Sequence, residues 1–192
     1  HMYRSTGDIV DRPNSFRDIA FSQIPMLSQS APGCYNDTDM LICGMYNKGN
    51  VGFGGCNQEQ YDMHFALWCM MASPLMIGCD IRKMDEKTKW ILTHKGMIAI
   101  DQDPLCMQGR RVRHNKKTGE DIWVKPLSDM RWTVALCNRS KKKKALTFKI
   151  EDLSLSKGVK GKLWNVWNDC DAGKFDTEFS CEVESHGTEV FI

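Results

Sequence analysis

The stretch Cys34-Tyr35-Asn36-Asp37-Thr38-Asp39-Met40-Leu41-Ile42 places two carboxylates two residues apart, directly before an apolar segment. In an extended backbone, residues i and i+2 point to the same side, so Asp37 and Asp39 are expected to face one pocket. An acidic side chain at the end of a buried strand is costly unless it binds something. The stretch therefore predicts a functional site at the end of a strand.

The residues that follow this stretch alternate between helical and strand patterns. Apolar residues recur at helical spacing over 57–73, with Asn57 as the candidate N-cap and Gln60 as its capping-box partner. Pro74 is expected to stop this helix. The run Leu75-Met76-Ile77-Gly78-Cys79 then predicts a short, fully buried strand.

A second helix is expected to begin at a cap on Asp85 and to end at Gly96. Strands and helices that alternate with short connections are typical of a parallel sheet with crossover helices. The first part of the chain, residues 1–108, is therefore predicted to be α/β.

The pattern changes after residue 108 to short runs of β-forming residues separated by turn-forming residues. The predicted strands lie at 122–124, 132–136, 145–150, 162–167, 179–183 and 188–192. Turn chemistry separates them, for example at Asp171-Ala172-Gly173 and in the lysine run 141–144, which we interpret as a solvated hairpin turn. Strands at this spacing predict an antiparallel β-sandwich over residues 109–192.

Composition excludes several classes of partner. The 26 basic and 24 acidic residues give a net charge of +2, so neither nucleic acid nor an anionic membrane surface is an expected partner. No apolar run approaches the roughly 20 residues that span a bilayer. His1-Met2 resembles the remnant of a cleaved affinity tag, so the natural start is expected to lie upstream.

The nine cysteines are odd in number and include no C-x-x-C pair, so a zinc site is not expected. Cys69 and Cys79 lie inside apolar segments, as small hydrophobic residues do. We therefore expect reduced, structural thiols, which favours a cytoplasmic protein.

Several segments, taken in order, resemble one enzyme family. The stretch around Asp37 and Asp39 resembles the Trp-Asn-Asp-Pro-Asp-Met signature of the retaining α-galactosidases and α-N-acetylgalactosaminidases of glycoside hydrolase family 27. Tyr3-Arg4-Ser5-Thr6-Gly7-Asp8-Ile9 is similar to the family's Arg-x-x-x-Asp loop. The segments 72–82 and 97–105 resemble its later motifs. Departures are Tyr35 in place of Trp and Thr38 in place of Pro.

The resemblance implies the C-terminal part of a (β/α)8 barrel, about strands seven and eight with their helices, followed by an antiparallel β-sandwich. By the residues alone, Arg4 and Asp8 would be a solvated ion pair. By resemblance, Asp8 is the general acid/base, Arg4 and Asp39 bind the sugar with Met40 packed nearby, and Asp37 supports the loop. No cofactor or metal is implied.

The resemblance also implies that the nucleophile lies in an N-terminal barrel segment outside these 192 residues, so that the chain alone does not hydrolyse glycosides. The implied substrate is an α-galactoside, with an α-N-acetylgalactosaminide or a β-L-arabinopyranoside as alternatives. Self-association into a homo-oligomer stays open.

A non-catalytic role is the second hypothesis: the sandwich would be a structural module or would hold carbohydrate through Trp123, Trp164 or Trp167. Alternation with apolar neighbours favours core packing for these residues. The glycine-rich run 47–56 either shapes the leaving-group side of the substrate mouth or is a plain flexible loop.

Overall fold

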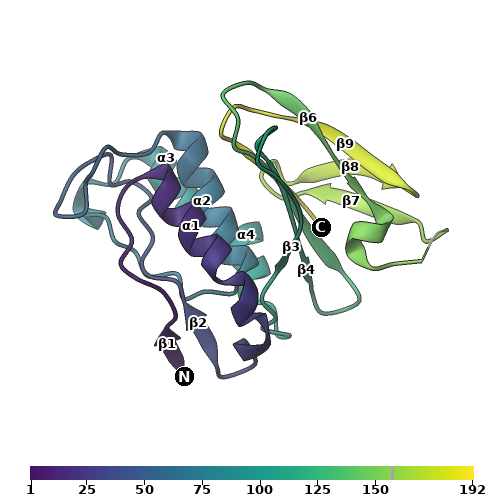
Figure 1. Cartoon of the computed structure of the whole chain (residues 1–192), viewed down its shortest axis with the longest axis horizontal. Helices are drawn as coiled ribbons and strands as arrows, with labels where there is room; N and C mark the ends of the chain where they lie inside the picture. Colours follow the sequence, from purple (N-terminus) through teal and green to yellow (C-terminus); the bar gives the residue numbers. More distant parts are fainter. Residues whose placement is uncertain (157) are drawn as a thin grey trace.

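The computed structural model describes residues 1–156 and 158–192, which form an α/β part and a β-sandwich side by side (Figure 1). The helices and strands of the α/β part, in chain order, are β1 (Met2–Arg4), α1 (Pro13–Ser22), a 3-10 turn (Ile24–Gln29), β2 (Tyr35–Asp37), α2 (Gln58–Met70), a 3-10 turn (Ile81–Lys83), α3 (Glu86–Leu92) and α4 (Lys95–Asp101). β1 pairs in parallel with β2, and a single parallel bridge joins Leu41 to Ile77. These pairings order three neighbouring segments as in a parallel barrel wall.

The helix α1 crosses from β1 to β2 and lies at the front of the view in Figure 1. Pro13 stands in its first turn, where the missing N–H costs nothing. Phe16, Ile19 and Ala20 recur at helical spacing and are buried. The sequence reading above does not assign this helix, although its proline and its apolar spacing are the signals that mark one.

The predicted cap of α2 is confirmed. Asn57 Oδ1 accepts from the backbone N–H of Gln60, and Gln60 Oε1 accepts from the N–H of Asn57, both at 3.0 Å or less. The helix ends at Met70, three residues before the expected Ser73, because Ala72 adopts a left-handed backbone with φ of 50°. Residues on every side of α2 are buried, because the helix lies between α1, α3, α4 and the sandwich.

Two predictions for residues 75–96 are wrong. The run 75–79 makes one isolated bridge, and Met76 and Ile77 are 54% and 48% exposed rather than fully buried. The expected single helix from Asp85 to Gly96 is two helices, because the side chain of His94 accepts from Met97 N and starts α4. The Asp85 cap is confirmed, since its carboxylate accepts from Thr88 N at 2.7 Å.

The second part is the predicted antiparallel sandwich. Its strands are β3 (Arg110–Asn115), β4 (Glu120–Pro126), β5 (Trp132–Asn138), β6 (Lys144–Lys149), β7 (Gly161–Asn165), β8 (Cys170–Phe175), β9 (Glu178–Val183) and β10 (Thr188–Phe191), with a 3-10 turn at Ile150–Leu153. Six strands form one sheet in the order β3-β4-β5-β10-β7-β8, and β6 pairs with β9 in a second sheet. The sequence reading misses β3 and β8, and the expected turn 171–173 lies inside β8.

The six-stranded sheet is covered on both faces. Ile122 and Val124 of β4 pack into the core shared with β6 and β9, whereas Trp123 between them packs into the core of α1 and α2. Because successive residues of a strand face opposite sides, a sheet buried on both faces needs continuous apolar runs. This explains why Ile122-Trp123-Val124 contains no polar residue.

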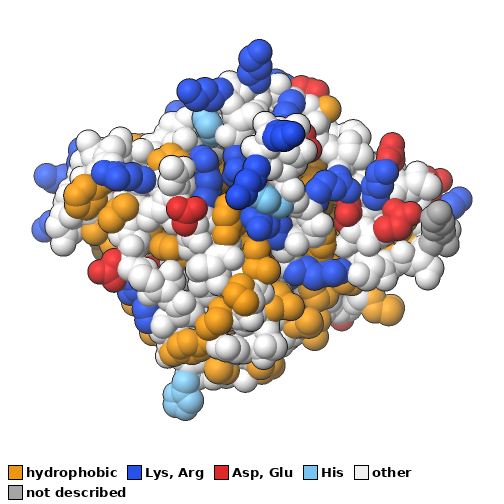
Figure 2. Space-filling model, viewed as in Figure 1, with side chains coloured by type: hydrophobic (Ala, Val, Ile, Leu, Met, Phe, Trp, Pro, Cys, Tyr) orange, Lys and Arg blue, Asp and Glu red, His pale blue; other side chains and the backbone are white. Residues whose placement is uncertain are grey.

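The surface of the described residues has one basic region of note. Figure 2 shows Lys and Arg side chains, with histidines beside them, gathered over the junction between α1 and β3. None of the described helices is long and apolar enough to cross a membrane.

Candidate active site

Arg4 joins the two loops that carry the predicted site carboxylates. It is the last residue of β1, and its partner across the sheet is Asp37, the last residue of β2. Its Nη2 donates to Asp8 Oδ1 at 3.0 Å and to Asp39 Oδ2 at 2.5 Å. The structure therefore brings together Arg4, Asp8 and Asp39 from segments 35 residues apart, at the carboxyl ends of two adjacent parallel strands.

The expectation that Asp37 and Asp39 lie in extended backbone is wrong for Asp39. Its φ is 77°, in the left-handed region, so the i, i+2 alternation ends at Asp37. Asp37 Oδ1 instead accepts from Asp39 N at 3.0 Å, which is the hydrogen bond of an Asx turn. Aspartate tolerates a positive φ better than most non-glycine residues, and this turn directs the chain away from β2 directly after Asp37.

The Asp39 carboxylate is held by the protein from several directions. Oδ2 accepts from Ile9 N at 2.7 Å as well as from Arg4, and Oδ1 accepts from Met40 N at 2.7 Å. The side chain is 14% exposed. Asp39 thus fixes the loop that follows Asp8 against the end of β2, and Met40 beside it is half-buried.

Asp8 differs from Asp39 in its surroundings. Its side chain is 96% exposed, so the carboxyl that meets Arg4 is open to a ligand. The segments on either side of the site are also exposed. Met2 and Tyr3 of β1 are 53% and 39% exposed, and Met76 and Ile77 at the opposite end are 54% and 48% exposed. Exposed apolar residues on strand edges are typical of a surface that another segment covers.

Two side chains of α2 hold the segment after Asp39, and sequence reasoning misses both. Trp68 Nε1 donates to the Asp39 carbonyl at 2.8 Å. His64 Nε2 accepts from Ile42 N at 3.1 Å, and its ring lies 4.0 Å from that of Trp68. Their spacing of four residues places them on one helix face, which is the signal that marks them as a pair.

We expect stability to fall below about pH 6.5 because of His64. Complete burial lowers the pKa of His64 from 6.5 to about 3, so the unfolded chain binds a proton that the folded chain rejects between these values. The free energy of unfolding should drop by about 2 kcal/mol between pH 6.5 and 5 from this group. Urea unfolding across this range should show a flatter pH dependence in His64→Gln, and an equally steep profile would contradict the assignment.

The glycine-rich run 47–56 is tied to the segment that follows Asp8. Asp11, fully buried, accepts from Asn47 N at 2.7 Å and from Tyr61 Oη at 3.0 Å. The backbone N–H of Asp11 donates to Val51 O at 2.8 Å, and its backbone carbonyl accepts from Gly55 N at 2.9 Å. The run is therefore anchored beside the Asp8 loop, and Asp11 is a supporting residue that the motif comparison does not include.

Gly78 leaves no room for a side chain next to the site. A Cβ there would lie 2.7 Å from both the Leu41 carbonyl and Met40 Sδ. The Leu41 carbonyl lies beside the Leu41–Ile77 bridge and accepts from the N–H of Gly78 at 3.0 Å, so it cannot move away easily. Gly78→Ala should therefore lower the free energy of unfolding by about 1–3 kcal/mol. The urea midpoint checks this; Gly7→Ala, where nothing lies within 4 Å, is the matched control.

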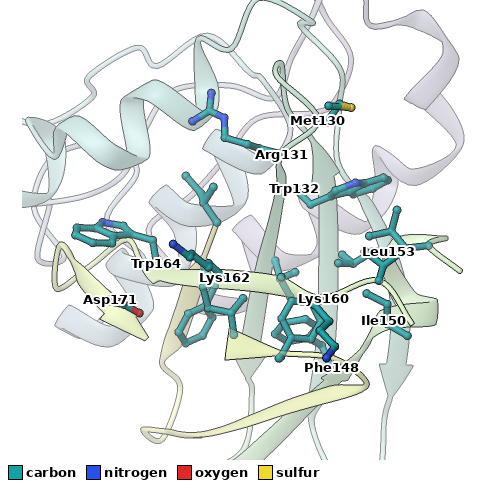
Figure 3. Close-up of a pocket in the computed structure, with 18 residues that line it drawn as sticks. Met130, Arg131, Trp132, Phe148, Ile150, Leu153, Lys160, Lys162, Trp164 and Asp171 are labelled. Atoms are coloured by element: carbon teal, nitrogen blue, oxygen red, sulfur yellow. The ribbon is translucent and has the colours of Figure 1, made fainter. Parts of the chain in front are cut away.

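The tryptophans of the sandwich separate into two groups. Trp123 is a completely buried core residue, whereas Trp167 is half-buried and packs its ring 5.6 Å from that of the exposed Trp90. Trp164 is 45% exposed and borders a cavity of about 540 Å³. In Figure 3, Trp164 and Asp171 lie at one side of this cavity and Trp132 and Phe148 at the other.

Within residues 1–156 and 158–192, no group of three His, Cys, Asp or Glu side chains could hold a metal ion. All nine cysteines are free thiols, and Cys43 and Cys69 are completely buried. Burial raises the pKa of both thiols well above the ordinary value, which keeps them protonated and inert.

Comparisons with known proteins cover nearly the whole chain. Residues 1–103 match the sequence profile described as Alpha galactosidase A, and residues 117–192 match that of the Alpha galactosidase C-terminal beta sandwich domain. An alpha-galactosidase of Cyamopsis tetragonoloba is 35% identical over the full chain, which covers 44% of that relative. Alpha-galactosidase 3 of Arabidopsis thaliana is 33% identical, with 43% of its length covered.

A solved structure from Bacteroides fragilis, described as a candidate alpha-galactosidase/melibiase, superposes with a TM-score of 0.90 at 35% identity. The superposition covers 100% of this chain and 42% of that one. The chain thus spans less than half the length of these relatives. Both its halves match, in order, the barrel and the sandwich of one enzyme group, and the chain belongs to the α-galactosidase family of glycoside hydrolases.

Proposed function

We propose that this chain supplies the general acid/base and part of the sugar-binding site of a retaining α-galactosidase. The nucleophile would come from a barrel segment outside these residues. The observation that carries the proposal is the Arg4 bridge, which sets Asp8 and Asp39 at the carboxyl ends of adjacent parallel strands. Active sites of (β/α)8 barrels lie at this end of the strands.

Retaining glycosidases use two carboxyl groups roughly 5–5.5 Å apart, one as nucleophile and one as acid/base. Asp8 has the open carboxyl that the second role needs, since it must reach the departing oxygen and then the incoming water. Both oxygens of Asp39 already accept hydrogen bonds from Arg4, Ile9 N and Met40 N. This engagement supports a positioning and sugar-holding role for Asp39 rather than attack on the sugar.

Arg4 is suited to orient the sugar. Among the described contacts, Gly7 O, Asp8 and Asp39 all accept from Nη2. The side chain is 38% exposed, and no acceptor among the described residues bonds its Nε or Nη1, so these donors are available to a sugar hydroxyl. Asp37 would act indirectly, through the Asx turn that places Asp39.

The exposed strand edges support a completing segment as the chain's first partner. Met2 and Tyr3 at one end and Met76 and Ile77 at the other would be covered when further barrel strands pair there. Mixing the chain with the polypeptide encoded directly upstream of it should yield hydrolysis of an aryl α-galactoside. Neither piece should be active alone, and an inactive mixture that forms a stable complex would refute the proposal.

The sugar specificity that we propose is for terminal α-galactose, as the names of the similar proteins suggest. α-N-Acetylgalactosaminides and β-L-arabinopyranosides are the alternatives. The first differs from an α-galactoside at carbon 2 of the sugar, and the second differs from it at carbon 5. Comparing kcat/KM of the reconstituted enzyme for the three aryl glycosides decides among them.

A second function, carbohydrate binding by the sandwich, is favoured only by Trp164 at the edge of the 540 Å³ cavity. An exposed indole stacks on the apolar face of a sugar ring. Galactoside binding to the whole chain that Trp164→Ala removes and Asp8→Asn leaves intact would establish this function. Binding that Trp164→Ala leaves unchanged would dismiss it.

We also propose a reducing compartment, the cytoplasm, for this protein. The nine free thiols, several of them packed as core residues, support this. Thiol titration of the denatured protein from its native source should find all nine reactive; disulfide-linked pairs would contradict the proposal.

A further inference from the structure

The basic region between α1 and the six-stranded sheet is a built cluster rather than a scatter of surface charges. Arg111 of β3 lies with its guanidinium carbon 4.1 Å from the ring centre of Phe21, and that of Arg139 lies 5.8 Å from it. The Phe21 ring also stacks on the buried Trp123 at 6.4 Å. These ring contacts hold the two arginines in place.

One carboxylate serves this cluster among the ion pairs of the described residues. Asp121 is 1% exposed, and it accepts from His114 at 2.5 Å and from Arg139, with Arg111 at 3.6 Å. Its two oxygens are therefore shared among three basic side chains. Within the described residues, no ion pair joins this carboxylate to a further arginine on α1.

Arg17 is that further arginine. It lies one helical turn before Phe21 on α1, so both side chains are on the face that meets Arg139. Its Nε and Nη2 are buried and have no hydrogen-bond partner among the described residues. Burial and the neighbouring Arg139 lower the pKa of Arg17 from its ordinary value. A guanidinium in this position lacks an acceptor that buried charged donors normally have.

His186 adds a second unpartnered group at the same place. Its backbone N–H donates to Ser140 O at 3.2 Å, which sets it beside Arg139. Its Nδ1 is buried without a partner. Burial, and then the charges of Arg17 and Lys141, lower the pKa of His186.

We propose that Arg17, Arg139 and His186 form a binding site for a small tetrahedral oxyanion, phosphate or sulfate, free or as the ester group of a larger molecule. Arg17, Arg111 and Arg139 with the single carboxylate of Asp121 leave excess positive charge. The fork of a guanidinium matches two oxygens of such an anion. The anion would accept from the Arg17 Nε and Nη2 that the protein leaves unsatisfied. This site is independent of glycoside hydrolysis.

Isothermal titration of the whole chain with inorganic phosphate, at constant ionic strength in chloride, tests the site. We expect one saturable site that Arg17→Met weakens by about tenfold or more, since hydrogen bonds to charged groups are lost. Arg82→Met, an exposed arginine paired with Asp80 at 2.9 Å, should bind as the unchanged chain does. No saturable binding, or equal binding by the Arg17→Met and Arg82→Met variants, would overturn the proposal.

Arg17→Lys keeps the charge and guards against a folding failure of Arg17→Met. It should weaken phosphate binding by less than Arg17→Met does, because an ammonium lacks the planar fork; unchanged affinity would also overturn the proposal. Parallel titrations with galactose 6-sulfate and galactose 6-phosphate separate the sources. Tighter binding than inorganic phosphate identifies an ester group as the ligand, and weaker binding identifies the free ion.

Discussion

Replacing Asp8 by Asn should lower kcat/KM of the reconstituted enzyme by roughly 10²–10⁴-fold toward an α-galactoside with a poor leaving group. An amide has no proton to give to the departing oxygen and cannot take one from water. For an aryl galactoside whose phenolate leaves without protonation, the substitution should slow the first chemical step, formation of the galactosyl-enzyme, by a smaller factor. This dependence on leaving group distinguishes proton transfer from sugar binding, which would weaken both substrates alike.

Asp18→Asn, an exposed carboxylate of α1 outside the site, is the matched control for Asp8→Asn. It should leave both substrates unaffected. If the two variants behave alike, or if Asp8→Asn loses equal activity on both substrates, Asp8 is not the acid/base.

Replacing Lys125 by Met should destabilise the chain by about 2–4 kcal/mol. Lys125 of β4 is completely buried, and its Nζ donates to Cys69 O at 3.0 Å and Ile100 O at 2.6 Å. These carbonyls lie in the last turns of α2 and α4, where helix dipoles favour a cation. Each such hydrogen bond contributes about 1.5–3 kcal/mol, partly offset by the cost of burying the ammonium.

Urea unfolding measures this effect, with Lys117→Met in an exposed turn as the control. Asp101 lies beside Lys125, and burial raises its pKa while the lysine opposes that rise. Adding Asp101→Asn to Lys125→Met should therefore recover part of the loss, because it removes a carboxyl left without its cation. An unchanged midpoint in Lys125→Met would show that the two halves are held together by other contacts.

The parts of the fold that the sequence predicts are those where one local cause dominates. The Asn57–Gln60 capping box and the Asp85 cap are local hydrogen bonds, so residue types at fixed spacing suffice. Apolar runs in β4, β5 and β10 follow from burial on both faces of one sheet.

The elements that escape prediction are stabilised by contacts distant in sequence. β3 carries three arginines and a histidine, whose partners lie on other elements. Arg113 pairs with Asp152, and Arg110 donates to Ser154. Arg111 and His114 lie against Asp121 of β4. β8 contains Asp171 and Gly173 and reads as a turn, because it is an exposed edge strand with little apolar content. The apolar run 75–79 predicts a buried strand. In the structure it makes one isolated bridge, and no further strand among the described residues pairs with it or covers Met76 and Ile77.

The sequence likewise predicts only part of the candidate site. The motifs locate Arg4, Asp8, Asp37, Asp39 and Met40, and the structure adds that Arg4 physically joins two of the loops. Asp39 has a left-handed φ, and Trp68 and His64 of α2 bond Asp39 O and Ile42 N in the segment after β2. The four-residue spacing of His64 and Trp68 is visible in the sequence, but their contacts with the segment after β2 are not.

Azide rescue of an Asp8→Ala variant tests most directly whether Asp8 is the general acid/base. With an activated aryl α-galactoside, the reconstituted variant should accumulate the galactosyl-enzyme. Azide should enter the space left by the Asp8 carboxyl, form the new C–N bond and displace the nucleophile's carboxylate. The expected product is α-galactosyl azide, with retained configuration. β-Galactosyl azide would assign Asp8 as the nucleophile, and the absence of any azide product, with the unsubstituted enzyme active, would remove Asp8 from the reaction.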